Sequence, residues 1–116
     1  MMDQEFLRLD ALLRRMRLGI ADHELSRERV QAQITSLAQE EAKLAAQAAK
    51  ARQMGRADLA HVALARQQEA EGHRGELSVQ LDQVLAAEAK LTVAAQRLQT
   101  KKTLQQFGLD DQGGEP

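Results

Sequence analysis

The sequence predicts an all-α protein, a long antiparallel two-helix coiled-coil hairpin. Three observations predict it. Apolar residues recur at alternating spacings of three and four along most of the chain, which is the heptad pattern of a coiled coil. Near the midpoint a glycine and then an aspartate interrupt that pattern. The single proline is at position 116, where it breaks neither half, and the sparse β-branched residues do not alternate as in a strand.

The first arm of the hairpin has a heptad seam along its whole length. The expected seam positions are Phe6, Leu9, Leu13, Met16, Ile20, His23, Arg27, Val30, Ile34, Leu37, Glu41, Leu44, Ala48 and Ala51. His23, Arg27 and Glu41 are the polar members of this series. A seam of this kind buries its apolar side chains against a partner helix.

The expected tip of the hairpin comprises Gly55, Arg56, Ala57, Asp58 and Leu59. Gly55 suits the C′ position of the first helix, because glycine accepts a left-handed backbone without steric cost. Asp58 suits the N-cap of the second helix, where its carboxylate accepts from exposed backbone N–H groups. A connection this short forces the two helices to be antiparallel neighbours. The alternative is one continuous helix, and the equal lengths of the two arms favour the hairpin.

The second arm has a similar stripe. Its expected members are Leu59, Ala63, Arg66, Ala70, His73, Leu77, Leu81, Val84, Glu88, Leu91, Ala95 and Leu98. Two successive spacings of four, at His73, Leu77 and Leu81, predict a stutter that locally unwinds the supercoil. Phe107-Gly108-Leu109 is expected to end the helix as a Schellman motif. The expected boundaries are about 3–54 for the first arm, 55–57 for the tip, 58–107 for the second arm and 108–116 for a disordered tail.

Four polar seam residues are candidates for setting the register. In an antiparallel hairpin with this tip, two residues lie at the same height when their residue numbers sum to about 112–115. The numbers of Glu41 and His73 meet this condition, and so do those of Arg27 and Glu88. We expect both pairs to meet across the hairpin and to fix its register, as buried polar residues do in coiled coils. The alternative is that all four side chains point outward.

The segment from Phe6 to Ile20 has two interpretations. Its apolar stripe is flanked by cationic residues, which are Arg8, Arg14, Arg15 and Arg17. Such a segment suits an anionic membrane surface or a partner. It is equally the first part of the coiled-coil seam, and the unbroken continuation of the stripe into Val30 favours that interpretation.

Composition excludes several classes of function. The net charge is −1 with both signs interspersed, which argues against nucleic-acid binding. The chain has no cysteine, no histidine pair at metal-ligand spacing, no phosphate-binding loop and no pocket expected for catalysis. We therefore expect no enzyme activity, no cofactor and no metal. No apolar run reaches membrane-spanning length and no signal peptide follows Met1, so a cytoplasmic protein is expected.

The residues around the tip resemble a known family. GRADLAHVALARQQ, preceded by EEAKLAAQAAKARQM, resembles the hairpin tip of the phage shock protein A family, which includes the vesicle-inducing protein in plastids and is related to ESCRT-III membrane remodellers. The residues that match the pattern of that tip are Asp58, Leu59, Ala60, Ala63, Leu64, Arg66 and Gln67. LSVQLDQVLAAEAKLTVAAQRLQTKK resembles the second arm of the same hairpin.

The resemblance implies a non-catalytic, oligomerising coiled-coil protein of the membrane-stress response or of membrane maintenance. It implies a homo-oligomer, or a co-polymer with a full-length family member, together with an AAA+ regulator and an anionic membrane surface as partners. It places the protein in the cytoplasm, peripheral on the inner face of the cell membrane. Because the resemblance covers only the hairpin region, assembly and partner binding are the properties expected to transfer, ahead of membrane insertion.

A second class of protein shares this architecture. Coiled-coil export chaperones and stalk subunits are hairpins of similar length, and they bind an ATPase ring and no lipid. Co-sedimentation with liposomes, combined with a pull-down from cell lysate, distinguishes the two.

Overall fold

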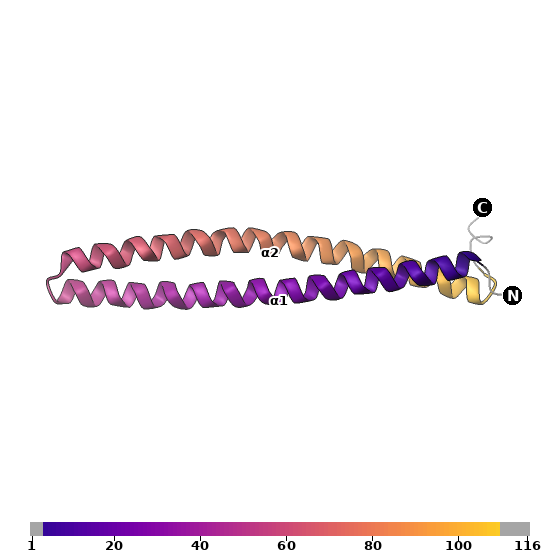
Figure 1. The fold of residues 1–116 in the computed structure, drawn as a ribbon, viewed down its shortest axis with the longest axis horizontal. Helices are drawn as coiled ribbons and strands as arrows, with labels where there is room; N and C mark the ends of the chain where they lie inside the picture. The colour runs from indigo at the N-terminus through magenta and orange to yellow at the C-terminus, as the bar shows by residue number, and fades with distance from the viewer. Residues whose placement is uncertain (1–3, 110–116) are drawn as a thin grey trace. The chain divides into compact units, whose positions relative to one another are not determined.

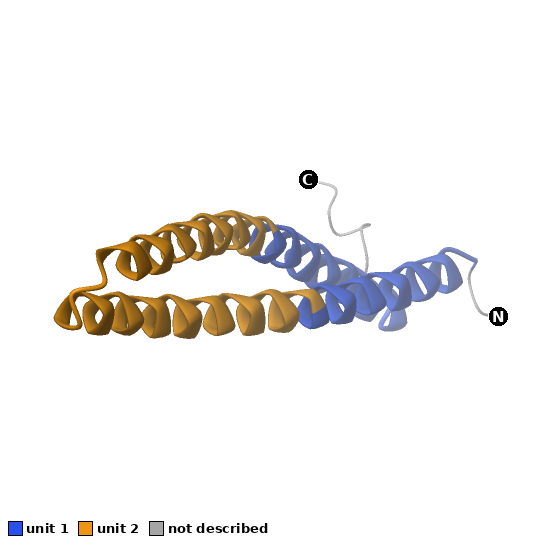
Figure 2. Cartoon of the chain, turned by 60° about the vertical axis from the view of Figure 1, so that its left-hand side comes forward, with its two compact units in different colours: residues 1–25, 84–116 blue, residues 26–83 orange. Residues whose placement is uncertain are grey.

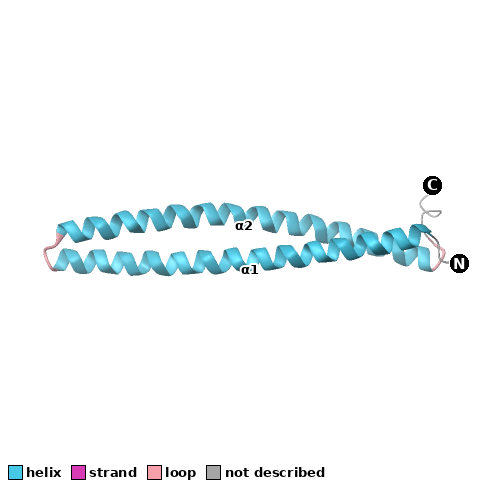
Figure 3. Ribbon diagram, in the orientation of Figure 1, coloured by secondary structure: helices cyan, strands magenta, loops and turns pink. Residues whose placement is uncertain are grey.

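The structure, a computed structural model, describes residues 4–109. It consists of two long helices, α1 (Gln4–Gln53) and α2 (Ala57–Gln106), joined by residues 54–56 (Figures 1 and 3). Residues 4–109 contain no strand. The predicted fold class, a long antiparallel two-helix coiled-coil hairpin, is confirmed.

Helix α1 ends in a Schellman motif in which Gly55 takes the C′ position that was predicted for it. The backbone of Gly55 is left-handed, with φ of 72°. Its N–H donates to the carbonyl of Arg52 at 3.0 Å, and the N–H of Arg56 donates to the carbonyl of Ala51 at 2.8 Å. These two bonds satisfy carbonyls that the helix end would otherwise leave without partners.

Helix α2 begins differently from the prediction, because its N-cap is Arg56 and not Asp58. The carbonyl of Arg56 accepts the first intrahelical bond, from the N–H of Ala60 at 3.1 Å. Asp58 is therefore the second helical residue. The N–H of Arg56 caps the end of α1 and its carbonyl begins α2, so the N-cap comes two residues earlier than expected.

The end of α2 matches the predicted Schellman motif. Gly108 has φ of 69° and donates to the carbonyl of Gln105 at 3.1 Å, while the N–H of Leu109 donates to the carbonyl of Leu104 at 2.7 Å. The predicted disordered tail lies, from residue 110 on, outside the described residues.

The chain divides into two compact units, each of which contains a segment of both helices (Figure 2). Unit 1 is Met1–Leu25 with Val84–Pro116, and unit 2 is Ser26–Gln83. Each unit is described below by its own contacts.

The seam of α1 is as predicted. Each of its fourteen expected positions is buried or half-buried. In unit 1, Leu9 and Leu13 are exposed by only 7% and 1%. In unit 2, Val30, Leu44 and Ala48 are buried in the same way. The three–four spacing is therefore the true packing face of this helix.

The seam of α2 confirms nine of the twelve predicted stripe positions and corrects the other three. Its buried and half-buried positions run, without a stutter, through Ala60, Ala63, Gln67, Ala70, Arg74, Leu77, Leu81, Val84, Glu88, Leu91, Ala95, Leu98, Lys102 and Gln105. Leu59, Arg66 and His73 are exposed. Each of these three precedes a true seam residue by one position, which is about 100° of rotation around the helix. Small alanines fit the seam beside the tight turn, and the larger Leu59 stays outside.

Candidate functional site

A polar layer crosses the seam of unit 2. The guanidinium of Arg74, on α2, donates to the carboxylate of Glu41, on α1, through its Nε and through its Nη2, the latter at 3.2 Å. The side chain of Glu41 is only 14% exposed. Because hydrogen bonds to charged groups are stronger than neutral ones, this two-pronged contact fixes the heights of the two helices relative to each other.

The prediction that Glu41 pairs with His73 is wrong. The His73 side chain is exposed, and the adjacent Arg74 takes its place. A polar layer at Glu41 does join the two helices, but the partner of Glu41 is Arg74 and not His73. The error follows from the one-residue offset in the predicted stripe of α2.

The second predicted pair, Arg27 with Glu88, stays a prediction. Both side chains are half-buried at seam positions. Arg27 belongs to unit 2 and Glu88 to unit 1.

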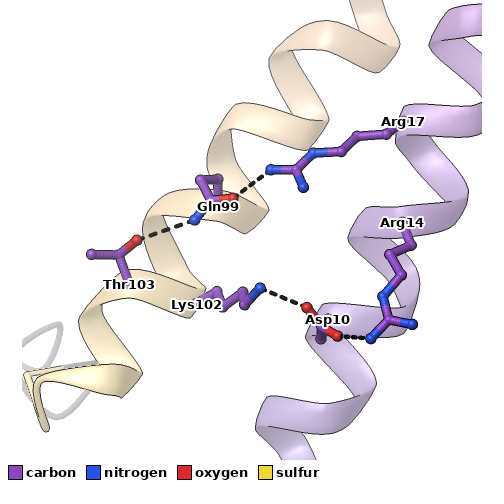
Figure 4. A network of polar contacts seen from close by, with 6 residues as sticks. All are labelled: Asp10, Arg14, Arg17, Gln99, Lys102 and Thr103. Atoms are coloured by element: carbon purple, nitrogen blue, oxygen red, sulfur yellow. Dashed lines mark hydrogen bonds and ion pairs between the residues drawn. The ribbon is translucent and has the colours of Figure 1, made fainter.

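Unit 1 has a polar network that the sequence analysis did not identify (Figure 4). Nζ of Lys102 donates to Oδ1 of Asp10 at 2.6 Å, and Arg14 donates to the other carboxylate oxygen from one turn along α1. The hydrogen bond from Lys102, and then that from Arg14, hold the pKa of the Asp10 carboxyl below its ordinary value. The sequence carried a signal for this contact, because the residue numbers 10 and 102 sum to 112, which is the value expected for residues at the same height of the hairpin.

The same network extends along the hairpin. Nη2 of Arg17 donates to Oε1 of Gln99 at 2.6 Å, and Nε2 of Gln99 donates to the hydroxyl of Thr103 at 3.3 Å (Figure 4). The ammonium of Lys102 also lies 5.5 Å from the centre of the Phe6 ring, which is cation–π distance. Lys102 is therefore a seam residue held by Asp10 on one side and an aromatic face on the other.

These contacts decide between the two interpretations of the segment from Phe6 to Ile20. Its apolar residues, Phe6, Leu9, Leu13, Met16 and Ile20, are buried or half-buried in the seam. Of its arginines, Arg14 and Arg17 are bound within the hairpin. This stripe is the coiled-coil seam and does not face a membrane while the hairpin is folded. Arg8 and Arg15 are exposed.

The tip carries an ion pair and an apolar groove. Nε and Nη2 of Arg56 donate to the two carboxylate oxygens of Asp58, at 3.1 and 3.0 Å. This pair, and then the N–H of Leu59, hold the pKa of Asp58 below its ordinary value. Next to it is a groove of about 330 Å³ between the two helices, in which Leu59 and Val62 are half exposed.

Apolar faces on the outside of unit 1 are a further feature that the sequence analysis missed. On α1, Leu7, Leu18 and Leu25 are exposed by 52%, 67% and 58%. They are spaced by three and then two helical turns, so they share one face. Each lies two residues from a seam residue, which places it on the opposite side of the helix from the seam.

Helix α2 repeats this arrangement in unit 1. Val93 and Leu104, exposed by 45% and 38%, lie three turns apart and on the same face as the exposed Ala86. They too lie opposite the seam, two residues after Leu91 and Lys102. We call Leu7, Leu18 and Leu25 the outer face of α1, and Ala86, Val93 and Leu104 the outer face of α2.

Within residues 4–109, no group of three or more acidic or histidine side chains is placed to hold a metal ion. Neither helix of this part is both long enough and apolar enough to cross a membrane.

Comparisons with protein-family models, with curated proteins and with solved structures found no match.

Proposed function

We propose that this chain is a non-catalytic coiled-coil scaffold that acts by assembling with copies of itself or with a longer chain of the phage shock protein A type. Its setting is membrane maintenance or the membrane-stress response, in the cytoplasm and on the inner face of the cell membrane. An AAA+ regulator is the further partner that the resemblance implies.

One observation carries the proposal: both helices of unit 1 expose a second apolar face. A hairpin that worked alone would need only the seam, with polar residues everywhere else. Here, large apolar side chains repeat at helical spacing on the side away from the seam. We interpret this repeat along one side of each helix as an interaction surface, because helices with two apolar faces suit bundles of more than two helices.

The setting at the membrane rests on the resemblance of the tip and of the second arm. Cationic residues beside the outer faces are consistent with a setting at the membrane. On α2, Lys90 and Arg97 lie one turn from Val93 on either side, whereas on α1 Leu18 has Arg15 one turn before it and Asp22 one turn after it. Cations that border an apolar helix face suit an anionic surface.

The test of assembly is sedimentation of the full chain at micromolar concentration. We expect a species larger than one chain, and we expect Leu18→Gln with Val93→Gln to shift it to the monomer. Leu85→Gln is the matched control, because Leu85 is also exposed on α2, by 39%, but lies about 100° around the helix from Ala86 and so outside the outer face. A wild-type chain that stays monomeric, or a control that dissociates as fully as the double variant, would refute the proposal.

The cellular setting is tested separately. A pull-down from lysate that recovers a longer coiled-coil chain or an AAA+ protein, together with sedimentation on anionic liposomes, supports the membrane role. Recovery of a rotary or export ATPase with no lipid binding supports the alternative class of ATPase-bound hairpins.

A further inference from the structure

We infer that the groove beside the hairpin tip binds residues 107–116 of a second copy of this chain. The inference rests on the proposed function, in that it assumes assembly between copies. The inference adds a second contact between copies, at the tip groove and away from the outer faces, and it identifies the segment that fills the groove.

The groove is apolar and accessible. It lies between α1 and α2 of unit 2, and its floor includes Leu44, which is 6% exposed. Its walls include Met54, Leu59 and Val62, which are exposed by 65%, 48% and 50%. Three large apolar side chains that stand open to solvent around one groove are more than a folded hairpin needs, because none of them supports the seam.

The rim of the groove is positively charged. Lys50 and Arg66 are the charged residues that line it, and both are exposed. The acid closest to it in sequence, Asp58, is bound by Arg56. The groove therefore favours a segment that brings apolar side chains together with negative charge.

One segment of the chain has that composition. Phe107 and Leu109 are exposed by 72% and 65%, on either side of the left-handed turn at Gly108. Asp110, Asp111 and Glu115 follow, and no lysine or arginine occurs after Lys102. Two apolar anchors followed by acids complement an apolar groove with a cationic rim.

The segment of the same chain does not reach the groove. Along α2, 45 residues separate Val62 from Phe107, which at 1.5 Å per residue is about 68 Å of helix. Residues 110–116 extend at most about 25 Å. The occupant must therefore come from another copy.

A contact of this kind is heterologous, because the groove of one copy meets the 107–116 segment of the next. Each copy that joins leaves one groove and one segment open, so the contact propagates until a ring closes or the concentration limits growth.

The test is direct binding of a labelled peptide of residues 103–116 to the full chain, measured by fluorescence anisotropy. The receptor carries Phe107→Ser and Leu109→Ser, so that its own segment does not compete. We expect binding that weakens at least tenfold in a receptor that also carries Val62→Asp. We expect a similar loss with Lys50→Glu and Arg66→Glu. All of these side chains are exposed, and circular dichroism verifies that each receptor melts as a helical hairpin.

Charge reversal on both sides makes the test specific. A peptide with Asp110→Lys and Asp111→Lys should bind the Lys50→Glu, Arg66→Glu receptor at least tenfold better than it binds the unreversed receptor. The inference is overturned if the natural peptide does not bind at millimolar concentration, or if it binds all receptors equally.

Failure here and failure of the proposed function are distinguishable. If the wild-type chain assembles and the outer-face variants dissociate while the peptide never binds, only the groove inference is wrong. If the peptide binds as described but the outer-face variants assemble like the wild type, the groove inference stands and the outer-face proposal is wrong.

Discussion

At the scale of single residues, Asp10 links folding to pH. Its carboxylate is held by Lys102 and Arg14, which lower its pKa in the folded chain. A group with a lowered folded pKa contributes stability above its unfolded pKa, which is about 3.9 for aspartate. That contribution is lost as the pH falls through the folded pKa.

We predict that Asp10→Asn lowers the melting temperature at neutral pH and that this deficit shrinks as the pH falls below about 4. The measurement is thermal unfolding followed by circular dichroism across that range. Asp22→Asn is the control, since Asp22 is an exposed aspartate of the same helix. A deficit for Asp10→Asn that is the same at every pH would show that the ion pair with Lys102 is not its cause.

The layer formed by Glu41 and Arg74 gives a second prediction at this scale. Arg74→Leu should destabilise the hairpin because it leaves the half-buried carboxylate of Glu41 without its guanidinium. The double change Glu41→Leu, Arg74→Leu should be less harmful than the sum of the two single changes.

The neighbouring histidine supplies the control for that cycle. Substitution of His73 by leucine should show no coupling to Glu41, because the His73 side chain is exposed. Urea unfolding of the single and double variants measures both couplings, and a coupling to His73 as large as that to Arg74 would contradict the structure.

At the scale of the helices, glycines divide into those that the fold needs and those that it does not. Gly72 and Gly75 lie in the interior of α2, and a Cβ on either would meet nothing within 4 Å. Gly55 also has open space, but its φ of 72° is one that an L side chain rarely adopts.

We predict that Gly72→Ala and Gly75→Ala each stabilise the hairpin by about 0.8–1 kcal/mol, which is the difference in helix propensity between the two residues. Gly55→Ala should destabilise it by about 1 kcal/mol, because alanine pays a steric cost in the left-handed region. Chemical denaturation measures all three. If Gly72→Ala and Gly75→Ala stabilise the hairpin and Gly55→Ala destabilises it, the cause is backbone conformation, because all three positions have open space for a Cβ. A change of stability in the same direction at all three positions would contradict that explanation.

The helices also show what the sequence could and could not predict. The ends of α1 and α2 were predictable because glycine at C′ is a strong local signal, and the seam of α1 was predictable because leucine, isoleucine and valine mark one face. On α2, alanine is common on several faces. Leu59, Arg66 and His73 then look as good as the residues that follow them, although each following residue lies about 100° further around the helix and is the one that packs in the seam.

The missed contacts have a related cause. A search for the one strongest apolar stripe finds the seam and passes over Leu18 and Val93, which lie on the other side of their helices. The contact between Asp10 and Lys102 was missed because Lys102 looks like a solvent-exposed residue at the end of a helix. The sum of their residue numbers places Lys102 opposite Asp10, but the predicted stripe of α2 ended at Leu98 and so did not include Lys102.

At the scale of the whole molecule, the face available to a membrane is not the one that the N-terminal sequence suggests. The stripe that contains Phe6 is buried in the seam, so we expect any membrane contact of the folded hairpin to use the outer faces of unit 1. Arg15 on α1 and Arg97 on α2 are exposed beside Leu18 and Val93 on those faces. An anionic surface would attract these charges, and the apolar side chains would enter only its headgroup region.

We predict that the chain sediments with vesicles that contain anionic lipid and not with neutral vesicles. Binding should weaken as salt is added, because exposed charges are screened beyond about 10 Å at 0.1 M. Arg15→Gln and Arg97→Gln should each reduce binding about fivefold, since a basic residue near an anionic surface contributes about 1 kcal/mol. Arg52→Gln removes an equal charge from the tip region, does not line the groove and should have little effect. Equal binding to neutral vesicles, or an equal loss with Arg52→Gln, would show that the outer faces of unit 1 are not the membrane contact.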